Sequence, residues 1–165
     1  MSDLLAHAGL DPDRLIAAAH EVAHALGFAA AGVPVTEIKV YGRGADAAGH
    51  VFVPGGIEVT NLRGFAVAHF AGRAADLRWC DEHDLPPAPE RTCATDMRLV
   101  RDFIRDAGRH AKAQGEKFAP GWGSLRNEAH RFVCAHWPTI ARLAPRLART
   151  GSLSPDRIPL TDSAA

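Results

Sequence analysis

His20, Glu21 and His24 form an H-E-x-x-H sequence within a stretch rich in Ala and Leu. Such a stretch favours a helix, in which His20 and His24 lie one turn apart on the same face. Two imidazoles placed in this way can bind one Zn²⁺. Glu21 then lies beside the metal, where its carboxylate can take a proton from a zinc-bound water. Because a third protein ligand normally completes such a site, the motif predicts a hydrolytic zinc centre that is still one ligand short.

The motif also has a simpler interpretation. The chain contains 9 His among 165 residues, so a short sequence of this kind can arise by chance. A pair of histidines four residues apart can also lie on a solvated helix face. The flanking residues are apolar, which is typical of a buried helix, so we favour the metal site.

The helix that carries the motif has start and stop signals. Asp11 is suited to the N-cap and Pro12 to the first helical position, and Gly32 follows the last helical residues. The apolar stretch 15–35 has the length of a membrane span, but it is rich in Ala and Gly and contains the motif itself. We therefore predict a buried core helix over about 12–31.

Composition indicates one domain over residues 1–165, with 47% hydrophobic and 23% charged residues as in ordinary soluble proteins. Its 19 basic residues balance 19 acidic ones, so no global charge attracts nucleic acid or an anionic membrane. Three cysteines without C-x-x-C spacing, and no recognisable signal peptide, favour a reducing compartment. We expect a cytoplasmic protein with neither nucleic-acid nor membrane partners.

The remaining patterns predict a mainly α (α+β) fold with one small sheet beside the motif helix. Residues 35–41 and 51–53 are typical of strands joined in a hairpin. Helices are expected from about 62 to 83, capped by Asn61, and from about 95 to 115. A further helix is expected to begin at a Ser124 cap, and Pro138 and Pro145 are expected to make a bent or broken helical segment of 139–150 after it.

Helical periodicity does not identify the third metal ligand. The side chains outside the motif that could serve are Glu58, His69, Asp76, Cys80, Asp81, Glu82, His83, Asp84, Cys93 and Asp96. We expect structural or exposed roles for His69, Cys80, His83 and Cys93.

Several further segments resemble the zinc-peptidase domain of the FtsH-type ATP-dependent proteases. Residues 35–49 (VTEIKVYGRGADAAG) resemble the family's strand, Arg-Gly turn and following glycine. Residues 71–76 (AGRAAD) are similar to its A-G-R-A-A-E segment, and residues 94–97 (ATDM) to the segment that supplies its third zinc ligand. Residues 143–158 resemble its closing helix and tail, so the resemblance covers about residues 14–158.

This resemblance implies zinc on His20, His24 and Asp96, with Glu21 as the general base. A carboxylate near a helix N-terminus, as expected for Asp96, is held ionised by backbone N–H groups and the helix dipole. Asp76 stands where the family has Glu, and we expect it to orient a ligand imidazole. It is also the alternative third ligand.

The chain departs from the family by having Ala23 where Gly is usual, and its 165 residues contain no Walker A sequence, ATPase module or membrane anchor. We therefore expect a standalone zinc metalloendopeptidase that cuts unfolded or flexible protein segments. An extended substrate is expected to pair with the exposed edge of the sheet, at residues 51–53. The alternatives are a metal-stabilised protein-binding or regulatory module with little catalysis, and a peptidase subunit that needs a separate ATPase or a homo-oligomer.

Overall fold

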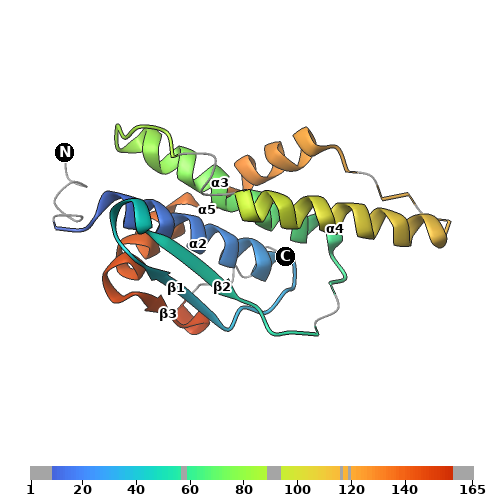
Figure 1. Cartoon of the computed structure of the whole chain (residues 1–165), viewed down its shortest axis with the longest axis horizontal. Helices are drawn as coiled ribbons and strands as arrows, with labels where there is room; N and C mark the ends of the chain where they lie inside the picture. Colours follow the sequence, from blue (N-terminus) through green and yellow to red (C-terminus); the bar gives the residue numbers. More distant parts are fainter. Residues whose placement is uncertain (1–8, 57–58, 89–93, 116, 119, 158–165) are drawn as a thin grey trace.

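Four helices and a small antiparallel sheet, which packs on the first and last of these helices, make up the fold in the computed structural model, which describes residues 9–56, 59–88, 94–115, 117–118 and 120–157 (Figure 1). This arrangement confirms the predicted mainly α (α+β) class. The helices are α2 (Pro12–Ala30), α3 (Leu62–Glu82), α4 (Ala94–Ala113) and α5 (Trp122–Thr150). The strands are β1 (Glu37–Tyr41), β2 (Ala48–Phe52) and β3 (Ser152–Leu153), and two short 3₁₀ helices are η1 (Gly44–Asp46) and η3 (Pro155–Arg157).

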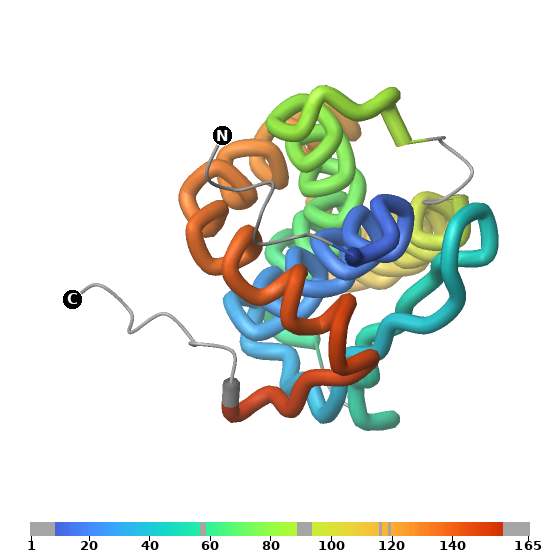
Figure 2. Tube along the Cα trace, turned by 90° about the vertical axis from the view of Figure 1, so that its left-hand side faces the viewer, coloured from blue at the N-terminus to red at the C-terminus, as the bar shows by residue number. Residues whose placement is uncertain are grey.

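Helix α2 lies in the middle of the fold. Its predicted start is confirmed, because the Asp11 side chain accepts a hydrogen bond from the backbone N–H of Arg14 at 2.9 Å. Every residue from Ala18 to Phe28 is buried. Figure 2 shows α2 (blue) between α5 (orange to red) and the hairpin (cyan). A helix covered on all sides must be apolar around its whole circumference, and residues 15–30 of α2 are apolar apart from the motif residues.

The sheet has the order β2-β1-β3, with Val40 opposite Gly49 and Ile38 opposite Val51 in the predicted hairpin. Strand β2 begins earlier than predicted, at Ala48, and lies at an edge. Strand β3 was not predicted, because two residues are too few to show an alternating pattern. Its pairing with β1 places the end of α5 beside the hairpin.

Helix α3 begins at the predicted cap, where the Asn61 side chain accepts from the N–H of Gly64 at 2.8 Å. It packs closely on α2: a Cβ added at Gly27 would lie 2.8 Å from Cα and Cβ of Ala68. Only a residue without a side chain fits such a crossing, so Gly27 and Ala68 let the two helix backbones approach each other.

The structure of α5 differs from the prediction at its start and at its prolines. Gly121, not Ser124, is the N-cap, because its carbonyl accepts the N–H of Leu125 and the Ser124 hydroxyl accepts from Arg63 instead. Of the predicted bend or break at Pro138 and Pro145, the break is absent, because one helix continues through both prolines. Each proline removes one helical hydrogen bond, but the apolar residues between and after them are buried in the main core, and this packing holds the helix together.

Arg14 joins three parts of the fold near the start of α2. Its Nε donates to the carbonyl of Ala148 at 2.7 Å, its Nη1 to Gly42 at 2.7 Å and its Nη2 to Val40 at 3.2 Å. The planar guanidinium can donate in several fixed directions, which an ammonium cannot do. Arg14 therefore ties α2 to the β1–η1 turn and to the last turn of α5.

In the described part of the chain, no helix has the length and apolar character of a membrane span.

We predict that Arg14→Ala lowers the free energy of unfolding by about 1.5–3 kcal/mol, since three carbonyls lose a charged donor. Urea denaturation followed by circular dichroism measures this change. Arg109→Ala is the control, because Arg109 is 71% exposed and pairs with an exposed Asp106. The control should change stability by less than about 0.5 kcal/mol, and an equal loss in both variants would contradict the role of Arg14.

Candidate metal site

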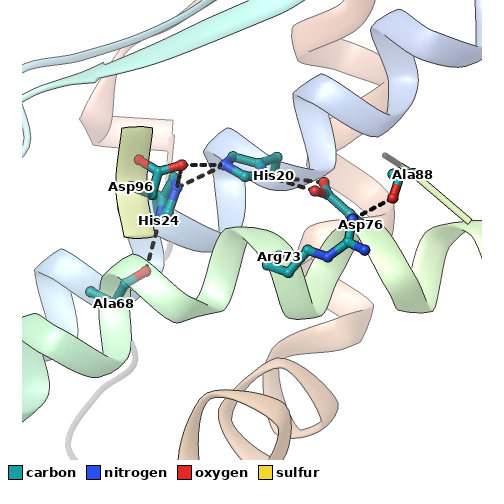
Figure 3. Close-up of polar contacts among 7 residues, drawn as sticks. All are labelled: His20, His24, Ala68, Arg73, Asp76, Ala88 and Asp96. Carbon is teal, nitrogen blue, oxygen red and sulfur yellow. Dashed lines mark hydrogen bonds and ion pairs between the residues drawn. The ribbon is translucent and has the colours of Figure 1, made fainter. Parts of the chain in front are cut away.

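The structure brings together three of the predicted site residues, His20 and His24 of α2 and Asp96 of the first turn of α4 (Figure 3). The two Nε2 atoms lie 2.9 Å apart. Oδ2 of Asp96 lies 3.2 Å from Nε2 of His20 and 3.5 Å from Nε2 of His24. These three atoms could together hold one metal ion.

Hydrogen bonds on the far side of each ring decide which ring nitrogen faces the site. Nδ1 of His24 donates to the carbonyl oxygen of Ala68 at 2.8 Å, and a carbonyl can only accept. Nδ1 of His20 lies 3.0 Å from each carboxylate oxygen of Asp76. With the proton of each neutral ring on Nδ1, both Nε2 atoms present lone pairs, as metal-binding imidazoles do.

The close approach of these lone pairs fits a bound cation. Two Nε2 lone pairs and a carboxylate oxygen repel one another unless a proton or a metal ion lies between them. Ligand atoms of a tetrahedral zinc site at 2.0–2.1 Å from the metal are about 3.3 Å apart, and the three separations here are 2.9, 3.2 and 3.5 Å. The donor set and its spacing therefore suit a small divalent ion.

The electrostatics of the site point the same way. Burial by itself lowers the pKa of His20, but the carboxylates of Asp76 and Asp96 outweigh this effect and raise the pKa well above its ordinary value. Burial also opposes the charge on Asp96, yet the two imidazoles, which donate to its carboxylate when Nε2 is protonated, hold the pKa of Asp96 well below its usual range. The pocket thus favours positive charge at its centre.

Asp76 lies behind the ring of His20, with only 1% of its surface exposed. It contacts Nδ1, whereas the metal-facing atom is Nε2 on the opposite side of the ring. This position fits the predicted role in orienting the imidazole, and it does not fit the alternative role as third ligand. Asp96, which the resemblance implies as the third ligand, is the aspartate that forms with His20 and His24 the group that could hold a metal ion.

A glycine of α3 makes room for the two imidazoles. A Cβ added at Gly72 would lie 2.5 Å from Nε2 of His20 and 2.6 Å from Nε2 of His24. No side chain fits there without displacing a ring. The two Nε2 atoms therefore lie against the backbone of α3, and the absence of a side chain at Gly72 determines how closely they approach it.

Glu21 lies between α2 and the edge strand β2. Its side chain is buried, and a Cβ added at Gly49 would lie 2.3 Å from Cγ of Glu21. Burial raises the pKa of Glu21 despite the nearby histidines. No hydrogen bond within the described residues holds its carboxylate, so the group is available to accept a proton.

The other candidates lie elsewhere, with one exception. Among the described residues, only His20, His24 and Asp96 form a group that could hold a metal. Glu58 and Cys93 lie outside the described residues. His83 stacks on Trp79 at the end of α3, and Cys80 is buried there. His69, for which we predicted a structural or exposed role, packs beside His24 with ring centroids 6.0 Å apart.

Sequence reasoning missed Ala68, whose contribution is a backbone carbonyl and leaves no side-chain signal.

Comparisons with known proteins add no assignment: no protein-family model matches the chain, and no curated protein matches it. The chemistry of the site is therefore inferred from its own residues.

We predict that Gly72→Ala weakens metal binding at least about 10-fold, because the new methyl group pushes the ligand rings apart. Isothermal titration calorimetry with zinc measures the affinity. Alanine favours a helix over glycine by about 1 kcal/mol, so α3 itself should not be lost, which circular dichroism can check.

Gly123→Ala is the matched control. It also places alanine in a helix, but nothing lies within 4 Å of the added Cβ. Unchanged zinc affinity in both variants would contradict the close packing of Gly72 against the two histidines.

Proposed function

We propose that this protein is a zinc-dependent metalloendopeptidase. His20, His24 and Asp96 hold the metal, and Glu21 acts as general base. The observation that carries this proposal is the meeting of two Nε2 atoms and one carboxylate oxygen within 3.5 Å of one another, with Glu21 next to the first ligand. Imidazole and carboxylate ligands suit zinc, and three protein ligands leave a position open for catalysis.

A zinc ion held by these ligands would make a water acidic near neutral pH and would polarise a peptide carbonyl. Glu21 takes the proton from the attacking water and passes it to the nitrogen of the leaving amine. Its buried position raises its pKa, and a carboxylate with a raised pKa is a stronger base. Asp76 and the Ala68 carbonyl hold the two imidazoles in the orientation and tautomer that this chemistry needs.

The edge strand supports an extended peptide substrate. In the described sheet, β2 pairs with β1 on one side and has no strand on its other side. Gly49 of β2 touches the side chain of Glu21, so a peptide added along this edge passes close to the base. Such pairing uses the backbone of the substrate, which only a flexible or unfolded segment can offer. This favours cleavage of unfolded chains.

A second function remains the alternative, in which the metal stabilises a binding or regulatory module. The observation in its favour is that the group His20, His24 and Asp96 joins α2 to α4, which a purely structural ion would also do. Catalysis that appears only with a separate ATPase chain is a third arrangement. Measurements on Glu21 separate the first two functions, because a structural ion has no use for a base.

We predict that protein purified without added metal contains about one zinc ion per chain. Asp96→Ala should lose this ion, because one of its ligands is removed. Asp76→Ala should bind zinc about 10–100-fold more weakly, because the His20 ring is no longer held. Elemental analysis and competition with a chelator measure both effects. Full retention of zinc by Asp96→Ala would show that the ligand set is wrong.

We predict that Glu21→Gln lowers the rate of cleavage of an unfolded protein such as reduced casein by a factor of about 10²–10⁴. The zinc content should stay unchanged, because Glu21 is not a ligand. Fluorogenic casein at matched zinc content provides the measurement. Equal rates in wild type and variant would attribute the cleavage to a contaminant or to a different base.

A further inference from the structure

His69 occupies a position beside the metal ligands that packing alone does not explain. It lies on α3 next to Ala68, which holds His24, and one turn before Gly72, which backs both ligand rings. These residues fall on the face of α3 that meets α2, so the His69 ring packs against His24 and Phe28 of that helix.

Three rings enclose the imidazole of His69. Its centroid lies 5.0 Å from that of Phe28, 4.8 Å from that of Phe65 and 6.0 Å from that of His24. Phe65 in turn packs on Phe103 of α4 at 4.7 Å. These surroundings are aromatic and largely apolar, and a phenylalanine at position 69 would suit them better than a polar ring.

A histidine at this position leaves a buried ring nitrogen without a hydrogen bond, which costs free energy of folding. Nδ1 of His69 is buried and has no hydrogen-bond partner. Among the described residues, no group forms a hydrogen bond with Nε2 of His69 either. An N–H group left unpaired in such a place costs about 1–3 kcal/mol. The neutral ring avoids burying an unpaired donor by carrying its proton on Nε2. Because the side chain as a whole is only partly buried, Nε2 is the nitrogen left to meet another molecule.

A neutral imidazole can donate a hydrogen bond without bringing a positive charge close to a bound cation. Donors of this kind, fixed before the reaction, stabilise the negative charge that develops on a carbonyl oxygen.

We propose that Nε2–H of His69 donates a hydrogen bond to the carbonyl oxygen of the peptide bond being cleaved, which makes His69 a further catalytic residue. This inference rests on the peptidase function proposed above. The aromatic cage fixes the ring, the partnerless Nδ1 fixes the proton on Nε2, and the position on α3 brings the donor to the side of His24.

The kinetic test compares wild type with His69→Phe on a fluorogenic peptide at equal zinc content. We expect kcat to fall about 100-fold with little change in KM, as when one fixed donor to the oxyanion is removed. Thermal stability should be unchanged or higher, because the buried unpaired nitrogen is gone. His69→Gln, whose amide can donate, should recover part of kcat. His136→Phe, at a histidine of α5 stacked on Phe132, should keep the kcat of the wild type.

A second measurement does not depend on activity. Nitrogen-15 NMR of the histidine rings in the zinc-loaded protein should show the proton of His69 on Nε2, and a bound peptide hydroxamate should shift that signal. A proton on Nδ1, or a signal that the hydroxamate leaves unchanged, would overturn the proposal. So would an active wild type with equal kcat in His69→Phe. An inactive wild type instead contradicts the peptidase function, and the NMR result then decides the His69 contact separately.

Discussion

The close approach of α2 and α3 is the constraint on which the site depends. Gly27 meets Ala68, and Gly72 meets the ligand rings, with no space for another carbon atom at either place. At this separation a backbone carbonyl of α3 can accept the Nδ1 proton of His24. A wider crossing would leave that imidazole free to rotate, and the two Nε2 atoms would no longer meet.

Two aspartates flank the same histidine and do different things because of where they lie. Asp76 is buried behind the ring and contacts Nδ1, so it fixes orientation and tautomer. Asp96 is partly exposed and contacts Nε2, so it offers an oxygen to a cation. The sequences around the two aspartates differ. Because the residue type is the same, the roles are distinguished by the ring nitrogen that each aspartate contacts: Nδ1 for the group that positions the imidazole, and Nε2 for the group that can bind a cation.

Local sequence signals predicted what is local in the structure. The spacing of His20 and His24, the Asp11 and Asn61 caps and the hairpin all depend on neighbouring residues, and all were predicted. Asp96 was one of many possible ligands until the family resemblance selected it, because its approach to α2 depends on tertiary packing. The carbonyl of Ala68, the cage around His69 and strand β3 also arise only from contacts between distant segments. The unbroken α5 shows the same limit, since buried packing outweighs the local effect of two prolines.

Helix α4 carries Asp96, the proposed third ligand, and is also the helix least embedded in the fold. Of its residues, only Val100 and Ala111 are buried among those described, and it packs mainly on α3 (Figure 1). A metal ion shared by α2 and α4 would act as a cross-link between them, so ion binding and helix docking become one coupled equilibrium. Ordering α4 costs free energy, so the observed affinity for the ion is lower than the intrinsic affinity of the site. The concentration of free metal ion would consequently determine how firmly residues 94–113 are held against the rest of the protein, as well as how much of the site is occupied.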